Sequence, residues 1–451
     1  MKKSFIFTFV MTILAGIIGA GFASGKEIVE FFGKAGYWAI PFLVIAGGLF
    51  FCCFYIFSWI GKIVKPKSIS DLTSAVFGRA GMFVDFGFIL SSFITLSSML
   101  AGCDSIGSLV FGSGYNFCYI SILTAIIVAI IVAVGLKFIY KVTDFIMPVM
   151  LGMIFIVLIL HLFTQAPQEV SPDNIKFNFI HVFIYSILYV SMNSFYNIFI
   201  IAKSSEYMDK KQIGKASTIA SSILFVLILL VFISIMRGGN NVFVSDMPMI
   251  NIASGLGAPI GIIYSIVLWL AIFTTICISA YTIREWLGRA IKNKFMCSVI
   301  VLTLGFIFSR FGFANIVRIF YPIEGIFGLF FIIYLVVYYF KNKKAYIAKQ
   351  NAIIENYNLS QNKAQEITYK DYSKKETVLA SPKAQKQSSA KSGAKQSVQS
   401  AKQTPKKKPP QNKFEIDKDD IYSVKVEHKK DEKVVTKKTR SGKVLVEKSK
   451  K

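Results

Sequence analysis

The feature that most constrains this chain is a series of apolar segments, each close to the length that crosses a membrane. Ten of them fall at residues 4–32, 37–60, 82–111, 117–139, 144–163, 179–201, 217–236, 259–281, 295–308 and 319–340. A helix needs about 20 residues to cross the hydrocarbon core of a bilayer. The sequence therefore predicts an all-α integral membrane protein with about ten transmembrane helices.

The distribution of positive charge predicts how these helices are oriented. If the N-terminus is cytoplasmic, 16 lysines and arginines of the first 340 residues fall on the cytoplasmic side and 6 on the outer side. Cytoplasmic loops carry the excess of positive charge in membrane proteins. We therefore expect a multi-pass protein of the cell membrane with both termini in the cytoplasm. Eight or twelve helices would give the same orientation.

The last quarter of the chain differs in composition from the rest. The formal net charge of the whole chain is +26, and residues from Lys341 onward hold 29 Lys/Arg against 12 Asp/Glu. Segments rich in Lys, Gln and Ser bury too little apolar surface to fold alone. We expect a transmembrane domain at 1–343 and a disordered cytoplasmic tail at 344–451. The tail is either simply solvated or attached to anionic lipid or an acidic partner; without a folded basic module its charge does not indicate nucleic-acid binding.

The motifs of common enzyme and metal sites are missing from the sequence. It contains no H-E-x-x-H, G-x-S-x-G or P-loop pattern, and its six cysteines form no C-x-x-C pair. Such patterns mark metalloproteases, hydrolases, nucleotide-binding sites and zinc sites. The sequence therefore favours a protein that is not an enzyme and has no resident metal or other cofactor.

The first apolar segment contains an unusual density of glycine. Its residues 15–27 read AGIIGAGFASGKE, with Gly16, Gly19, Gly21 and Gly25. Glycine lets the backbone leave helical geometry, and in a membrane the freed N–H and C=O groups must find partners, which a ligand can supply. Close helix packing of the GxxxG kind is the alternative, because Gly21 and Gly25 have that spacing.

The same stretch carries a resemblance to known transporters. Gly16-Ile17-Ile18-Gly19-Ala20-Gly21-Phe22 resembles the first-helix signature of the amino acid–polyamine–organocation superfamily, and the run from Gly19 to Glu27 is closer to the uncharacterised YkvI-like bacterial membrane proteins. The resemblance implies the LeuT-type fold: an inverted repeat of five plus five helices, with the first helix broken and the sixth broken opposite it. It also implies that the amides of Ala20, Gly21 and Phe22 receive a substrate carboxylate.

The resemblance assigns further residues to a substrate site. Besides the first-helix residues Gly19, Ala20, Gly21, Phe22 and Ser24, it implies Tyr189 and Asn193 from the sixth apolar segment. That segment contains no glycine or proline between residues 179 and 201, so a polar patch that bonds to neighbouring helices is an equal alternative to a second break.

Sodium-coupled members of this architecture imply an ion site between the first and eighth helices. The corresponding residues here are Ile18, Thr274, Thr275 and Ser279. Hydroxyl and carbonyl oxygens suit a hard cation such as Na⁺, although Thr and Ser in helices commonly bond back to their own backbone. The fifth segment, 144–163, lacks the lysine that replaces this cation in some proton-coupled relatives, which favours Na⁺ as the coupling ion but leaves a carboxylate relay open.

Acidic residues at membrane depth are costly and often functional. Glu27 follows the glycine-rich stretch and Asp104 lies late in the third segment, so both are candidates for coupling or gating. For Glu324, in the tenth segment, we expect a structural role as the partner of a nearby arginine or lysine.

These observations favour a secondary transporter that moves a small solute by alternating access, with an amino acid or a related amine or carboxylate as substrate. The main alternative is a membrane receptor or scaffold that acts through its basic tail. A channel is not excluded by these patterns.

Overall fold

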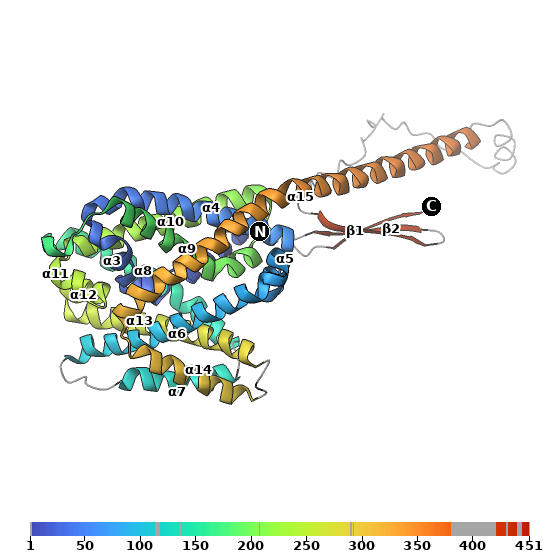
Figure 1. Ribbon diagram of the computed structural model, residues 1–451. Helices are drawn as coiled ribbons and strands as arrows, with labels where there is room; N and C mark the ends of the chain where they lie inside the picture. The colour runs from blue at the N-terminus through green and yellow to red at the C-terminus, as the bar shows by residue number, and fades with distance from the viewer. Residues whose placement is uncertain are drawn as a thin grey trace, which may run out of the picture. The chain divides into compact units, whose positions relative to one another are not determined.

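The computed structural model describes residues 2–112, 118–134, 137–206, 208–288, 291, 293–379, 421–429, 432–439 and 444–450. Two compact units are distinguished, Met1–Lys341 and Asn342–Lys451. The first unit holds the apolar segments, and its helices are drawn from blue to orange in Figure 1.

The helices of the first unit follow the ten apolar ranges closely. They are α1 (Lys2–Ile17), α2 (Ala20–Ser24), α3 (Lys26–Phe32), α4 (Ile40–Val64), α5 (Ile69–Phe77), α6 (Gly81–Phe111), α7 (Tyr119–Val134), α8 (Lys137–Thr164), α9 (Phe179–Ser204), α10 (Lys210–Arg237), α11 (Gly239–Val244), α12 (Pro248–Gly255), α13 (Ala258–Leu287), α14 (Lys294–Ser309) and the start of α15 (Phe313–Leu379). Short 3-10 turns, η1 (Gly33–Ala39), η2 (Gly78–Ala80) and η4 (Pro172–Asn174), lie between some of them.

Length and composition identify the helices that can cross a membrane. Among the described residues, six helical stretches are long and apolar enough to do so, and four shorter apolar helices lie at Ile6–Ile17, Tyr119–Val132, Pro148–Thr164 and Phe295–Ser309. Many large apolar side chains stay exposed on these helices, including Phe86, Ile130 and Ile266. Exposed apolar surface of this extent is typical of contact with lipid, so the chain is an integral membrane protein.

The helices pack in two groups, and α2 contacts α13 of the second group. In one group α4 packs against α9 and α10, and α1 packs against both of these; in the other, α6 packs against α13 and α14, and α14 against α7 (Figure 1). Glycine allows close approach within the first group, since a Cβ atom on Gly61 of α4 would lie 2.0 Å from the carbonyl oxygen of Ala202 in α9.

The second unit contains regular elements where its composition predicts none. Helix α15 runs on to Leu379, through a stretch after Lys349 that contains neither glycine nor proline and therefore nothing that breaks a helix. Three strands, β1 (Ile421–Lys429), β2 (Glu432–Thr439) and β3 (Val444–Lys450), form an antiparallel sheet in that order, with Val426 opposite Val435. Period-two valines such as Val444 and Val446 suit a strand. The disordered cytoplasmic tail expected at 344–451 stays a prediction, and its residues 380–420 lie outside the described residues.

Candidate functional site

The first apolar segment is broken, as the glycines predict. Helix α1 ends at Ile17 and α2 begins at Ala20, with the N-cap residue Gly19 in an extended conformation (φ −82°, ψ −173°). Gly19 offers the first turn of α2 no side-chain cap. A second interruption follows at Gly25, whose φ of 82° is left-handed and favours glycine. The segment is therefore three short helices instead of one.

Neighbouring helices supply hydrogen bonds to the broken segment. The hydroxyl of Tyr264 in α13 donates to the carbonyl of Ala23 at 2.6 Å, and Nδ2 of Asn197 in α9 donates to the carbonyl of Gly16 at 3.0 Å. Within the segment, the hydroxyl of Ser24 donates to the carbonyl of Gly21 at 2.7 Å. Irregular backbone at membrane depth requires such partners, so these polar side chains hold the break in place.

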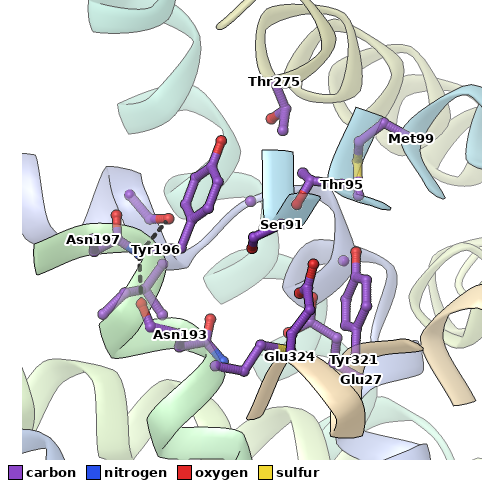
Figure 2. Close-up of a pocket in the computed structure, with 15 residues that line it drawn as sticks. Glu27, Ser91, Thr95, Met99, Asn193, Tyr196, Asn197, Thr275, Tyr321 and Glu324 are labelled. Carbon is purple, nitrogen blue, oxygen red and sulfur yellow. Dashed lines mark hydrogen bonds between the residues drawn. The ribbon is translucent and has the colours of Figure 1, made fainter. Parts of the chain in front are cut away.

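A cavity of about 70 Å³ opens beside this break (Figure 2). Its lining comes from α1, α2, α3, α6, α9, α13 and α15, and therefore from both groups of helices. The residues that line it are Gly16, Ile17, Gly19, Gly21, Glu27, Ser91, Thr95, Met99, Met192, Asn193, Tyr196, Asn197, Thr275, Tyr321 and Glu324. The volume accommodates a few water molecules or a small polar solute.

Two carboxyl groups face this cavity. Glu27 of α3 and Glu324 of α15 are 6% and 8% exposed, and among the described residues Oε2 of Glu27 and Oε1 of Glu324 have no hydrogen-bond partner. Both side chains are drawn in Figure 2. No lysine, arginine or histidine is among the lining residues. Burying carboxylates is costly unless they are paired, so this cavity is suited to a positively charged guest.

The sequence led us to expect that Glu324 pairs with a nearby arginine or lysine, and this expectation is wrong. None of the lining residues around it is an arginine or lysine, and its side chain lies in the cavity with Glu27. An acidic residue in an apolar segment, two positions after Pro322, was the signal in the sequence. The signal was ambiguous because arginines precede it at Arg310 and Arg318.

The comparisons with known proteins agree with this architecture. The chain is 25% identical over 325 residues to the uncharacterized membrane protein YkvI of Bacillus subtilis (strain 168), covering 70% of this chain and 91% of that protein. It is 24% identical to the uncharacterized protein YyaD of the same strain, covering 73% and 95%. The resemblance to the YkvI-like membrane proteins is confirmed. No protein-family model matches the chain.

Solved structures show which fold this chain has. The structure of MhsT in complex with L-phenylalanine superposes with a TM-score of 0.53 at 15% identity, over 71% of this chain and 86% of that one. The inward-facing structure of Mhp1 gives 0.52 at 15% identity, over 72% and 73%. The fold is therefore of the LeuT type.

The sixth apolar segment of the chain departs from the expected pattern. Helix α9 is continuous from Phe179 to Ser204, so the second break is absent. The side-chain amides of Asn193 and Asn197 donate to the backbone carbonyls of Tyr189 and Asn193, four residues earlier. The segment has no glycine or proline to release its backbone, which explains why it stays helical.

The predicted substrate residues divide into two sets. Gly19, Gly21 and Asn193 line the cavity, and Ala20 begins α2 beside it. The other three are placed elsewhere: Phe22 and Ser24 are fully buried in α2, and the ring of Tyr189 packs on those of Phe31, Phe32 and Phe50.

The predicted ion-site residues lie near the same break but are engaged in local bonds. The hydroxyls of Thr274 and Thr275 both donate to the carbonyl of Ala271, at 2.9 Å, and the hydroxyl of Ser279 lies 3.2 Å from that of Tyr196. Thr275 also lines the cavity, and Ile18 is buried beside it in the break. Oxygens that donate to their own helix can still accept or coordinate, so the sodium site stays a prediction.

Asp104 lies in a bonded cluster at the end of α6. Its carboxylate forms an ion pair with Arg310 at 2.7 Å and accepts a hydrogen bond from the hydroxyl of Ser121 at 2.7 Å. These contacts join α6, α7 and the residue that follows α14. These contacts support a structural role for Asp104. Glu27, the other candidate for coupling or gating, lines the cavity.

Proposed function

We propose that this protein is a secondary transporter that carries a small amine or amino acid across the cell membrane by alternating access. The observation that carries the proposal is the cavity at the break between α1 and α2, lined from both groups of helices in a LeuT-type fold. A site between two packed groups can be exposed to either side when one group moves against the other.

The chemistry of the cavity supports the amine end of the substrate. Glu27 and Glu324 present acceptors without a positive partner in the lining, and the hydroxyls of Ser91 and Thr95 add neutral polar groups. An ammonium group supplies both the charge and the N–H donors that these oxygens lack. MhsT is named in complex with the amino acid L-phenylalanine, and Mhp1 is named as a nucleobase-cation-symport-1 family transporter.

The carboxylate of an amino-acid substrate has a candidate place at the first turn of α2. The amides of Ala20, Gly21 and Phe22 begin this helix without a side-chain cap from Gly19. The carboxyl group of Glu27 lies against Gly21, because a Cβ built there would be 1.8 Å from Oε1. A substrate carboxylate at Gly21 would therefore meet a like charge, which favours amines over amino acids.

Coupling to Na⁺ through Ile18, Thr274, Thr275 and Ser279 belongs to the same proposal. We place both termini in the cytoplasm on the charge distribution of the sequence, and the partners are the substrate and the lipid bilayer.

The experiment that tests this function is a thermal-shift screen of the purified protein against amino acids and small amines, in Na⁺ or K⁺. A ligand that binds the folded state at about 100 times its Kd stabilises it by about 2.7 kcal/mol. We expect one ligand class to raise the melting temperature, and the same class to be taken up by proteoliposomes. A flat response from well-folded protein across the panel would contradict the proposal.

Gly19→Leu provides the site-directed arm of this experiment. A Cβ at Gly19 meets no atom within 4 Å, and its φ of −82° suits any residue, so the leucine fills the cavity without straining the backbone. Gly48→Leu is the matched control, because the Cβ there also meets nothing and the residue is on the exposed face of α4. We expect the ligand-induced shift to disappear in Gly19→Leu and persist in Gly48→Leu. An unchanged shift in Gly19→Leu would exclude this cavity as the site.

A further inference from the structure

Three buried oxygen atoms around the cavity have no donor among the described residues. They are Oε2 of Glu27, Oε1 of Glu324 and Oδ1 of Asn197, whose side chains are 6%, 8% and 1% exposed. All three residues line the same small cavity (Figure 2). Buried polar atoms are nearly always paired, and each exception needs an explanation. Here the unpaired atoms are all acceptors, so the missing partner is a donor.

The charged and titratable groups nearby do not supply that partner. Lys26, the neighbour of Glu27 in α3, directs its ammonium group to the carbonyl of Ser245 at 3.1 Å and to Glu30 at 3.5 Å. The hydroxyl of Tyr321 in α15 donates to Ser98 at 3.1 Å, and that of Tyr196 in α9 lies 3.2 Å from Ser279.

The elements packed against α3 contribute no cation to the two carboxyls either. The guanidinium of Arg237 in α10 points to the carbonyls of Leu162 and Gln165, both at 3.4 Å, and Lys34 in η1 is exposed. Tyr189 in α9 and Tyr264 in α13 are buried neutral phenols, and the latter is bonded to Ala23. None of these described cations therefore pairs with Glu27 or Glu324.

Two ionised carboxylates in one small buried cavity repel each other and lose their hydration. Carboxyl groups that repel each other in such a site do not both ionise, so one of the two keeps its proton. A proton on the pair supplies one O–H donor to the unpaired acceptors. The cavity without substrate then carries a single negative charge.

We propose that Glu27 and Glu324 form a proton-exchange pair, in which one proton and the ammonium group of the substrate occupy the cavity by turns. This proposal rests on the proposed function and specifies its mode: amine transport in exchange for a proton. When the ammonium enters, the protonated carboxyl releases H⁺ to the solvent on the open side, and the ammonium bonds to two carboxylates and the oxygen of Asn197. When the amine leaves as a cation, one carboxylate takes up a proton from the side then open.

The charge balance explains why the two processes are coupled. Two carboxylates with one proton, and two carboxylates with one ammonium, both carry a net charge of one negative unit. The doubly ionised empty cavity carries one charge more, and burying an uncompensated charge is strongly unfavourable. The protein can therefore switch between its outward-open and inward-open states with a proton or an amine bound. The empty form with both carboxylates ionised cannot make this switch.

The first test of the pair needs no ligand. Infrared spectroscopy of the full-length purified protein at neutral pH detects the C=O stretch of a protonated carboxyl, which shifts in D₂O. We expect this band in the wild type and its loss in both Glu27→Gln and Glu324→Gln. Glu206→Gln is the control, because Glu206 is not among the residues that line the cavity and is paired with Lys203 at 2.8 Å. A wild-type spectrum without the band, or a band that survives in either glutamine variant, would overturn the proton pair.

The second test measures proton release with a defined probe. Propylammonium chloride is added to weakly buffered protein with a pH indicator, and tetramethylammonium chloride is the matched cation without N–H donors. We expect about one proton released per protein on propylammonium binding, none with tetramethylammonium, and none in either glutamine variant. Release that is equal for the two cations, or no release with propylammonium, would overturn the exchange.

The outcomes also separate this proposal from the proposed function. If ligand-induced stabilisation and uptake proceed without proton release, the proposed transporter function is supported and the proton-exchange pair is rejected. A protonated-carboxyl band in a protein that stabilises and takes up no solute would reject the proposed function, and would leave the infrared result for the pair intact.

Discussion

The hydroxyl of Tyr264 holds the broken segment to α13. It donates to the carbonyl of Ala23 at 2.6 Å, and both residues are buried. Tyr264→Phe leaves that carbonyl without this donor, which costs about 1–3 kcal/mol when the group is buried. We expect a lower melting temperature and a weaker ligand-induced shift. The exposed Tyr37→Phe is the control and should change neither. Equal melting temperatures for Tyr264→Phe and the wild type would mean that α2 is held by other contacts.

Single residues differ in how far the sequence alone reveals their role. Glu27 was a candidate from the sequence because it directly follows the glycine-rich stretch, and it lines the cavity. Glu324 was not, because its position in the cavity depends on how α15 packs against α6 and α9, which no local pattern encodes. Ser24 was also predicted at the substrate site, and its hydroxyl donates to the carbonyl of Gly21, three residues earlier. Local hydrogen bonds compete with ligands for short polar side chains.

At the scale of elements, backbone chemistry decided which predictions were correct. Four glycines within residues 15–25 release the backbone between α1 and α3, and the break is present as expected. The predicted break in the sixth segment rested on the symmetry of the fold alone. Without glycine or proline, α9 completes its helical hydrogen bonds, and two asparagines back-bond to its carbonyls. The cavity is consequently shaped by a break on one side only.

The contact between α4 and α9 gives a prediction at this scale. A Cβ atom on Gly61 would lie 2.0 Å from the carbonyl oxygen of Ala202, so Gly61→Ala forces two packed helices apart. Overpacking of this kind costs about 1–3 kcal/mol, and we expect a lower melting temperature and poorer recovery of folded protein.

Gly48→Ala in the same helix is the control for that change. Its Cβ meets no atom within 4 Å, so the gain in helix propensity, about 0.5–1 kcal/mol, should leave it as stable as the wild type or more stable. Thermal denaturation in detergent of both variants measures the difference. If Gly61→Ala and Gly48→Ala melt alike, the close approach of α4 and α9 is not a source of stability.

At the scale of the whole molecule, the proposed activity belongs to one of the two units. Every residue that lines the cavity lies within the first unit, Met1–Lys341. Residues from Lys349 to the end hold 26 Lys/Arg and 12 Asp/Glu, so they carry most of the positive charge of the chain. Charge of this kind acts on anionic lipid within about 10 Å of the surface, and it adds nothing to the lining of the cavity.

Deletion of Lys349–Lys451 therefore separates a transporter from a scaffold. The change removes the charged segment and keeps the apolar helix Phe313–Ala348 complete. We expect the truncated protein to show the same ligand-induced rise in melting temperature as the full chain, and the same uptake in proteoliposomes of neutral lipid. In vesicles rich in anionic lipid, added salt should change the uptake by the full chain and leave the uptake by the truncated protein unchanged. The reason is that screening weakens the attraction between the basic segment and the lipid. A truncated protein that folds and binds ligand but no longer transports would assign the tail a part in the transport cycle. Retained uptake would leave the alternative, a receptor or scaffold acting through this tail, without support.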